Sequence, residues 1–337
     1  MNVLLVFLFG MKGAQCEDDG EDDEDELLKN IDQLLLDAYI SAYRHILNML
    51  PTFKANIHQL EEDELERLVV VMGNGISEGH CNDSSSLKHA ALNYVMKDFE
   101  QDTLTPPIPK SKMKSDRGFN HPVIARMLCP RALLDEFGED AHFLLKLCNG
   151  LVQATDEDWA SFLYEDGVFN PEAVDEGLFK GYFLVRVWRH IFTAPASALK
   201  KTPGPASGKK CNAEIHGMTR VTPRSIAYAA VQARFTLSTM EEWGELDGDF
   251  NQKRFFDNIV SLFEMDSKDP WAVETLAWWD KQVFVLQPSA NVNSNSNASR
   301  ATALSKLLEQ RKKRAAAARW SYDAGHSFVS RLLPLHI

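Results

Sequence analysis

Four polar side chains that could bind an anion recur at helical spacing in an otherwise apolar segment. Tyr182, Arg186, Arg189 and His190 fall at positions i, i+4, i+7 and i+8 of a helix that we expect over Leu178–Phe192. Residues at these spacings share one face of an α-helix. The pattern leaves two interpretations open: a face that is solvated or paired in salt bridges, or a strip that recognises an anion.

A second group of polar side chains lies in turns rich in Gly and Pro, beside segments that we expect to be buried. Its members are Asp116, Arg117, His121, His216, Arg220, Arg224 and Arg234. Polar side chains in such turns often line a cleft. The group predicts either a structural polar network or a ligand pocket. An enzyme acting on a phosphorylated or carboxylate substrate would need these side chains within about 4–6 Å of one another.

Motifs for other chemistries are incomplete. Residues 204–210, GPASGKK, are one residue short of a phosphate-binding loop and end in Lys where Ser or Thr is required. Residues 246–251, LDGDFN, lack the Gly and the Glu of a calcium loop, so we expect Asp249 to cap a helix. H-E-x-x-H, G-x-S-x-G and zinc-finger spacings of Cys and His are all absent. We therefore expect no cofactor, no metal and no catalytic residue.

Charge is unevenly distributed along the chain. The formal net charge is −12, and nine of the ten residues Glu17–Glu26 are acidic, which is typical of a disordered tail. Basic residues gather in three islands, at Pro109–Arg131, Leu199–Arg224 and Arg300–Trp320. If the islands share one face, they would bind nucleic acid or an acidic protein segment. Separate solvated loops are the alternative.

The clearest structural signal is a helix that begins after Thr222. The hydroxyl of Thr222 can accept an unpaired backbone N–H, and Pro223 suits the first helical position. Residues 226–237 are apolar on nearly every face, which is typical of a buried helix. Arg224 and Arg234 must therefore reach the surface, pair with a carboxylate or hold an anion.

Helical periodicity recurs along the rest of the chain, whereas alternating strand patterns do not. We expect an all-α protein, an irregular bundle of about ten helices. Gly73-Asn74-Gly75 predicts the end of a helix that begins at Asp63, and Asp83–Ser86 offers N-caps for the next helix.

The predicted organisation has four parts. They are a hydrophobic start with an acidic disordered tail (1–26), an all-α domain (27–287), a low-complexity linker (288–300) and a separate C-terminal basic helix with its tail (301–337). Trp271, Trp278 and Trp279 are expected to pack in the core, with a partner-binding role as the alternative.

Cysteine usage and hydropathy bear on the compartment. The five cysteines are far apart and include no C-x-x-C pair, which suits reduced thiols in a cytoplasmic or nuclear protein. The apolar run at residues 3–11 is shorter than the roughly 20 residues of a membrane span, so we expect no transmembrane segment. Secretion through a cleaved signal at residues 1–16 is the minority alternative.

Several long segments keep the order and spacing of a known family. They are DRGFNHPVIARMLCP (116–130), FLYEDGVFNPE (162–172), GLFKGYFLVRVWRHIFTAPASA (177–198), residues 213–238 and LAWWDKQVF (276–284). Together they resemble a family of uncharacterised proteins, a domain of unknown function, that is expanded in mushroom-forming basidiomycete fungi. The resemblance covers residues 47–284 and implies an intracellular fungal protein. It implies no activity and no catalytic residue.

These observations favour a protein that binds over one that catalyses. The expected partner is anionic, either nucleic acid or an acidic protein segment held by the basic islands. One competing hypothesis is an enzyme that uses the His/Arg cleft. Another is a scaffold or oligomerisation module, which would need a contiguous exposed apolar patch of several hundred Å².

Overall fold

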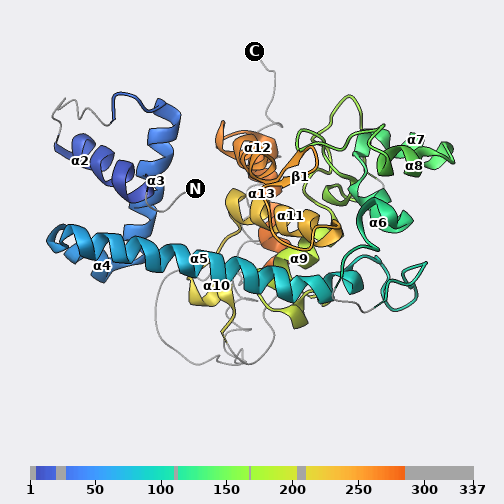
Figure 1. The fold of residues 1–337 in the computed structure, drawn as a ribbon, viewed down its shortest axis with the longest axis horizontal. Coiled ribbons are helices and arrows are strands. Elements are labelled where there is room, and N and C mark those ends of the chain that lie inside the picture. Colours follow the sequence, from blue (N-terminus) through green and yellow to red (C-terminus); the bar gives the residue numbers. More distant parts are fainter. Residues whose placement is uncertain (1–4, 20–27, 110–112, 167, 203–209, 285–337) are drawn as a thin grey trace, which may run out of the picture. The chain divides into compact units, whose positions relative to one another are not determined.

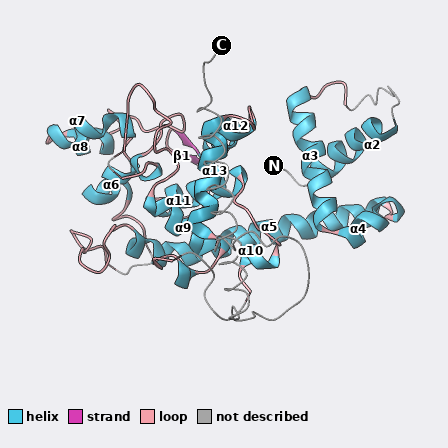
Figure 2. Ribbon diagram, turned by 180° about the vertical axis from the view of Figure 1, so that it is seen from behind, coloured by secondary structure: helices cyan, strands magenta, loops and turns pink. Residues whose placement is uncertain are grey.

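The computed structural model describes residues 5–19, 28–109, 113–166, 168–202 and 210–284. Within these residues the chain forms twelve α-helices and one two-stranded antiparallel sheet (Figure 1). Figure 2 shows how small the share of strand is. The all-α fold that the sequence predicts is therefore confirmed.

The helices follow one another with short connections, several of them single 3-10 turns. In chain order they are α2 (Met11–Asp19), α3 (Gln33–Met49), α4 (Pro51–Asn56), α5 (Glu62–Ala90), α6 (Pro122–Leu128), α7 (Leu134–Glu139), α8 (Phe143–Cys148), α9 (Tyr182–Phe192), α10 (Asn212–Ile215), α11 (Pro223–Leu237), α12 (Gln252–Glu264) and α13 (Pro270–Val283). The strands are β1 (Leu246–Asp247) and β2 (Phe250–Asn251).

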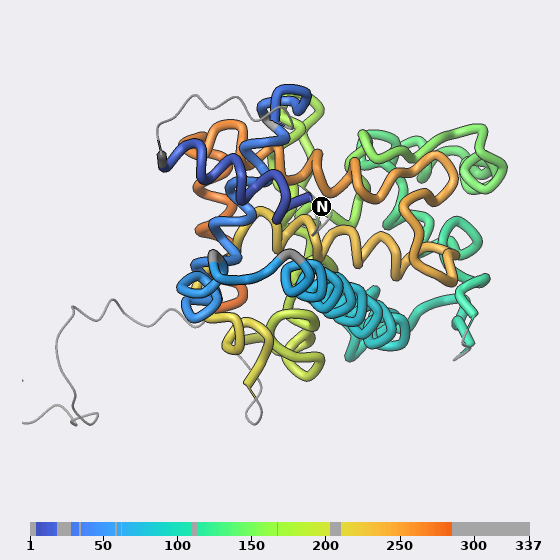
Figure 3. The backbone as a smooth tube through the Cα atoms, turned by 60° about the vertical axis from the view of Figure 1, so that its left-hand side comes forward, coloured from blue at the N-terminus to red at the C-terminus, as the bar shows by residue number. Residues whose placement is uncertain are grey.

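The first helices form an apolar cluster of their own. A π-helical turn, η1 (Val6–Gly10), runs into α2, and both lie beside α3 (Figure 3). The ring of Phe7 packs edge-on against Tyr43, with centroids 5.9 Å apart. Glu17 and Asp18 bind Arg44 of α3 at 2.7 and 2.9 Å. The first residues of the predicted acidic tail are therefore helical and paired, and residues 20–27 lie outside the described chain.

Helix α5 runs unbroken through Gly73-Asn74-Gly75, so the helix end predicted there is wrong. Leu68 and Met72 pack against the N-terminal cluster, whereas Leu87 belongs to the main core. Packing thus holds both ends of the helix. It outweighs the cost of about 1 kcal/mol that each glycine brings to a helix interior.

Helix α11 lies in the main core and contacts α5, α6, α9 and α12. The Thr222 hydroxyl accepts the N–H of Ser225 at 3.2 Å and so caps the helix, as expected. Twelve of its fifteen residues are buried, which confirms the prediction of a buried helix. The fully buried rings of Trp188 on α9 and Trp279 on α13 pack together, with centroids 6.2 Å apart.

A short hairpin, which the sequence pattern did not predict, precedes α12. Strands β1 and β2 pair around Gly248, whose φ of 61° suits the tight turn. Asp249 lies in this turn and accepts a hydrogen bond from Gln153 at 3.2 Å, so it does not cap α12. The Asn251 side chain does so instead, by accepting the N–H of Arg254 at 2.9 Å.

The described residues all fall within one compact unit, Met1–Leu286. The predicted linker and the predicted basic helix both fall beyond residue 284, outside the described residues. The boundary predicted after residue 26 stays a prediction.

Candidate functional site

The polar strip predicted on α9 is largely turned into the protein, not toward solvent. Arg186 donates from Nη1 to the carbonyls of Tyr94 and Met96, at 2.8 and 2.5 Å. Its Nη2 donates to the carbonyl of Lys97 at 2.7 Å. These carbonyls follow the end of α5 and its 3-10 extension η3 (Ala91–Tyr94), where helical carbonyls lack partners. Arg186 therefore fastens the end of α5 to α9.

Arg189 makes the same kind of contact on another side of α9. It donates to the carbonyl of Lys200 at 2.8 Å and to that of Gln282 at the end of α13. Burial lowers the pKa of both Arg186 and Arg189 below the usual arginine value. Neither guanidinium has a carboxylate partner among the described residues, so backbone carbonyls, and for Arg186 also the ring of Tyr182 at 4.9 Å, offset their charges.

Two cations of the first basic island are buried, whereas Arg126 is exposed and Lys110 and Lys112 lie outside the described residues. Lys114 and Arg117 are each only 1% exposed. Lys114 Nζ donates to the carbonyl of Phe235 at 2.8 Å and lies 3.6 Å from the centre of its ring. Arg117 donates to the carbonyls of Thr236 and Lys88, at 2.9 and 2.5 Å. Both cations thus cap the last turn of α11, where carbonyls lack partners.

The predicted His/Arg cleft does not form. Arg117 contacts Thr236 near the end of α11, whereas Arg224 lies twelve residues earlier on the same helix. That separation is about 18 Å, several times the 4–6 Å that a joint site needs. Arg224 instead pairs with Glu264 at 2.9 Å. Of the other members, Asp116, His216 and Arg220 are exposed, His121 is buried, and Arg234 is buried and paired with Asp247 at 2.8 Å.

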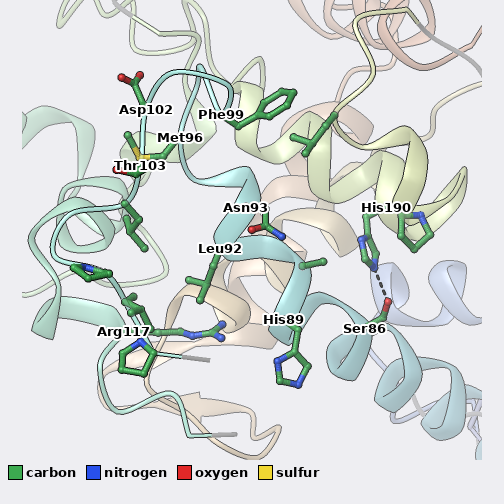
Figure 4. Close-up of a pocket in the computed structure, with 17 residues that line it drawn as sticks. Ser86, His89, Leu92, Asn93, Met96, Phe99, Asp102, Thr103, Arg117 and His190 are labelled. Atoms are coloured by element: carbon green, nitrogen blue, oxygen red, sulfur yellow. Dashed lines mark hydrogen bonds between the residues drawn. The ribbon is translucent and has the colours of Figure 1, made fainter. Parts of the chain in front are cut away.

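A cavity of about 1080 Å³ opens beside the end of α5; we call it the α5 pocket (Figure 4). Ser86, His89 and Asn93 project toward it from one face of α5 and η3, because they stand at positions i, i+3 and i+7. Residues 104–109 supply much of the opposite wall, and most of the lining is apolar. Ligand pockets in proteins typically have volumes of about 300–1,000 Å³.

Three of the residues singled out in the sequence belong to this pocket or support it. Arg117 and His190 line it. His121 is buried and donates from Nε2 to the carbonyl of Pro106 at 2.7 Å, which anchors the wall formed by residues 104–109. Its Nδ1 accepts the N–H of Ile124 at 3.5 Å and caps α6.

A chain of hydrogen bonds connects the pocket to the core. The hydroxyl of Ser86, which is exposed to the pocket, lies 2.7 Å from His190 Nε2 (Figure 4). His190 Nδ1 lies 2.8 Å from the buried hydroxyl of Tyr94, which lies 3.4 Å from the carbonyl of Pro195. Burial lowers the pKa of His190 to about 4 and raises that of Tyr94 to about 12. At neutral pH both side chains are therefore uncharged.

The polar run Asp83–Ser86 does not cap a helix, contrary to the prediction. It lies inside α5, and three of its side chains bond to other helices. Asp83 accepts from the Tyr228 hydroxyl at 2.9 Å, and Ser84 donates to Gln232 at 3.1 Å. Asp and Ser residues favour N-caps, so the sequence pattern predicted a helix start here and not the contact of Ser86 with His190. The only available signal was the helical spacing to His89 and Asn93.

A second groove, of about 640 Å³, adjoins α9 and α13; we call it the α9 groove. It is lined by Arg186 and Arg189 of the predicted strip and by Lys200 of the second basic island, together with the half-buried ring of Trp278. Six cationic side chains line it against four carboxylates. One ion pair, between Lys97 and Asp166 at 2.8 Å, is internal to this set.

The model of a family of unknown function, DUF6698, matches residues 74–284, which is more than half of the chain. The chain belongs to this family. No curated protein and no solved structure matches the chain. Both the α5 pocket and the α9 groove lie within the matched DUF6698 region, which begins after the N-terminal cluster.

The described residues of this DUF6698 protein contain no group of three or more His, Cys, Asp or Glu side chains placed to hold a metal ion. None of their helices combines the length and the apolar character that crossing a membrane requires.

Proposed function

We propose that this DUF6698 protein binds a largely apolar small molecule, carrying an uncharged hydrogen-bonding group, in the α5 pocket. The proposal rests on one observation: a cavity of about 1080 Å³ whose walls are mostly apolar and whose polar side chains converge from one helix face. Leu92, Met96 and Leu104 supply apolar wall, while Ser86 and Asn93 supply hydrogen bonds.

The charges around the pocket favour a neutral ligand. Apart from histidines, the titratable residues that line the pocket are Arg117 and Asp102, whose charges are opposite. Both terminal nitrogens of Arg117 already donate to backbone carbonyls. His190 stays uncharged because burial lowers its pKa to about 4. Because Arg117 is only 1% exposed and bound to two carbonyls, it presents almost no donor surface to an anionic ligand.

The test is binding of a neutral, solvatochromic dye such as Nile red to the full chain. We expect Ala90→Trp, which places a large ring in the pocket lining, to weaken dye binding at least about tenfold. The matched control is Ala277→Trp on the exposed face of α13, which should bind dye like the wild type. Equal binding by both variants would place the dye elsewhere and overturn the proposal.

The α9 groove supports a second candidate function, the binding of an anionic partner. The guanidinium charges of Arg186 and Arg189 have no carboxylate partner among the described residues, and Lys200 and Lys201 extend the same lining. The ring of Trp278 offers a flat apolar surface beside these cations. Nucleic acid and acidic protein segments are the partner classes with this chemistry.

A cytoplasmic or nuclear location fits both candidate functions. None of the five cysteines forms a disulfide in the structure, which supports a reducing compartment.

Retention on immobilised heparin tests the anionic partner. We expect retention that falls steeply with salt, and earlier elution of the variant Lys200→Glu/Lys201→Glu. The control variant Lys54→Glu/Lys268→Glu makes the same change in net charge at exposed positions outside the groove. If the two variants elute together, net charge alone governs retention and the α9 groove is not the site.

A further inference from the structure

Ser86 and His190 are arranged as a nucleophile and its base. The Ser86 hydroxyl is exposed in the α5 pocket and lies 2.7 Å from Nε2 of an imidazole that is 4% exposed. A third side chain, Tyr94, holds the other ring nitrogen at 2.8 Å. A nucleophile, a base within hydrogen-bond reach and a group that orients the base together define the usual architecture of an activated serine.

The surrounding acceptors determine which ring nitrogen carries the proton. If Nδ1–H of His190 donates to Tyr94, the Tyr94 hydroxyl can donate onward to the Pro195 carbonyl, 3.4 Å away. Nε2 is then left to accept the Ser86 hydroxyl proton. The opposite tautomer makes Tyr94 donate to Nδ1 and leaves the Pro195 carbonyl without this bond. The first arrangement makes one more hydrogen bond and leaves Nε2 as a base.

We propose that Ser86 is a nucleophile, with His190 as its base and Tyr94 as a positioning residue, and that it accepts the acyl group of a neutral carboxylic ester bound in the α5 pocket. The proposal rests on the function proposed for that pocket, since an apolar molecule with an uncharged hydrogen-bonding group describes such an ester. It adds a reaction that binding alone does not require.

The two half-reactions balance with water as the co-reactant. Ser86 Oγ attacks the ester carbonyl carbon and passes its proton to His190 Nε2. The carbon–oxygen bond to the alcohol breaks, and the alcohol leaves with that proton. Water then gives a proton to His190 and attacks the carbonyl carbon of the acyl-serine. The bond from that carbon to Ser86 Oγ breaks, Oγ takes the proton back from His190, and a carboxylic acid is released. His89, one helical turn after Ser86 on the same face, has a ring N–H that can donate to the carbonyl oxygen as it gains charge.

A fluorophosphonate probe tests the nucleophile, because it bonds covalently to activated serine hydroxyls. The full chain is incubated with the probe, digested, and the modified residue located by mass spectrometry. We expect the adduct on Ser86 and none in Ser86→Ala. The matched control is Ser85→Ala, an exposed neighbour whose hydroxyl makes no hydrogen bond among the described residues, and it should label like the wild type.

A second variant separates the base from mere structural support. His190→Gln should slow labelling about 100-fold or more if it keeps its circular dichroism spectrum. If this variant does not fold, Tyr94→Phe replaces it. That change removes the contact that orients Nδ1, and it should slow labelling while Ser86 remains the modified residue.

The outcomes distinguish this inference from the binding proposal. Dye binding that depends on Ala90, without an adduct on Ser86, overturns the acyl transfer and leaves the binding proposal intact. An adduct on another serine also overturns it. An adduct on Ser86, together with dye binding that is unchanged in Ala90→Trp, supports Ser86 as a nucleophile and overturns the α5 pocket as the dye-binding site. Steady release of 4-nitrophenol from 4-nitrophenyl butyrate, lost in Ser86→Ala, would show that the acyl-serine turns over.

Discussion

Among the described residues, three buried or half-buried guanidinium groups bind backbone carbonyls. Arg117 bonds to the last turn of α11. Arg186 bonds to residues that follow α5, and Arg189 bonds to the end of α13. A guanidinium keeps its charge when buried and offers five donors, and the last carbonyls of a helix carry partial negative charge without partners. The helical spacing of Arg186 and Arg189 therefore reflects the positions of helix ends as much as any ligand.

Arg186→Lys should destabilise the protein by about 2 kcal/mol. A lysine ammonium is a single point of contact, so it cannot reach the carbonyls of Tyr94, Met96 and Lys97 in the planar geometry that Arg186 provides. The measurement is the free energy of unfolding in denaturant. Arg126→Lys, at an exposed position of α6, is the control and should change stability by less than about 0.5 kcal/mol. Equal effects would contradict the structural role of Arg186.

His190 should make stability depend on pH between about 6.5 and 4. Burial lowers its pKa to about 4, whereas the unfolded chain has the ordinary value of 6.5. As the pH falls below 6.5, the unfolded chain takes up a proton that the folded chain does not, so the free energy of unfolding falls. The loss is complete near pH 4 and amounts to about 3 kcal/mol.

The check is denaturant unfolding at several pH values for the wild type and His190→Gln. Ser86 and Tyr94 hydrogen-bond to the His190 ring, and neither changes charge in this range. Between pH 6.5 and 4, the free energy of unfolding of His190→Gln should fall less steeply with pH than that of the wild type. The difference in slope should correspond to the uptake of about one proton on unfolding. Identical slopes would show that His190 titrates normally in the folded chain.

At the scale of elements, α5 and α9 build the site together. Ser86 comes from α5 and His190 from α9, so their hydrogen bond depends on how the two helices cross. Gly181, the N-cap residue of α9, lets the start of that helix lie against Phe162, because a Cβ there would overlap the Phe162 carbonyl oxygen. Arg186 then fastens the residues after α5. The α5 pocket is thus positioned by contacts that lie outside it.

Gly73→Ala and Gly75→Ala should each stabilise the protein by about 0.5–1 kcal/mol. Both glycines lie inside α5, and a Cβ at either position meets no atom within 4 Å. Alanine therefore restricts the unfolded chain without a steric penalty in the folded one. Thermal unfolding measures the gain. A loss of stability in both variants would indicate that α5 breaks here, as the sequence alone predicted.

At the scale of the whole molecule, the sequence predicts what local patterns determine. The cap at Thr222, the buried α11 and the all-α class all follow from local residue patterns. Three features depend on packing between distant segments, and the sequence gives no sign of them. Tertiary contacts carry α5 through Gly73 and Gly75, bury Lys114, and turn Ser86 toward His190, 104 residues away.

One exposed feature offers an alternative to the α5 pocket as the site of apolar binding. Val70, Val71 and Ile76 on α5 are 60–66% exposed, and a scaffold or oligomerisation module would use side chains of this kind. Val69 and Met72 pack in the N-terminal cluster, whereas these three side chains belong to neither apolar cluster. A ligand that bound by hydrophobicity alone would favour these side chains as readily as the pocket.

Photo-crosslinking with a neutral alkyl diazirine, followed by mass spectrometry of the digested protein, decides between these sites most directly. Binding in the α5 pocket predicts adducts within residues 86–109 and 190–199, and their loss in Ala90→Trp. Adducts centred on Val70, Val71 and Ile76, or spread over the N-terminal cluster and unchanged in that variant, would contradict it.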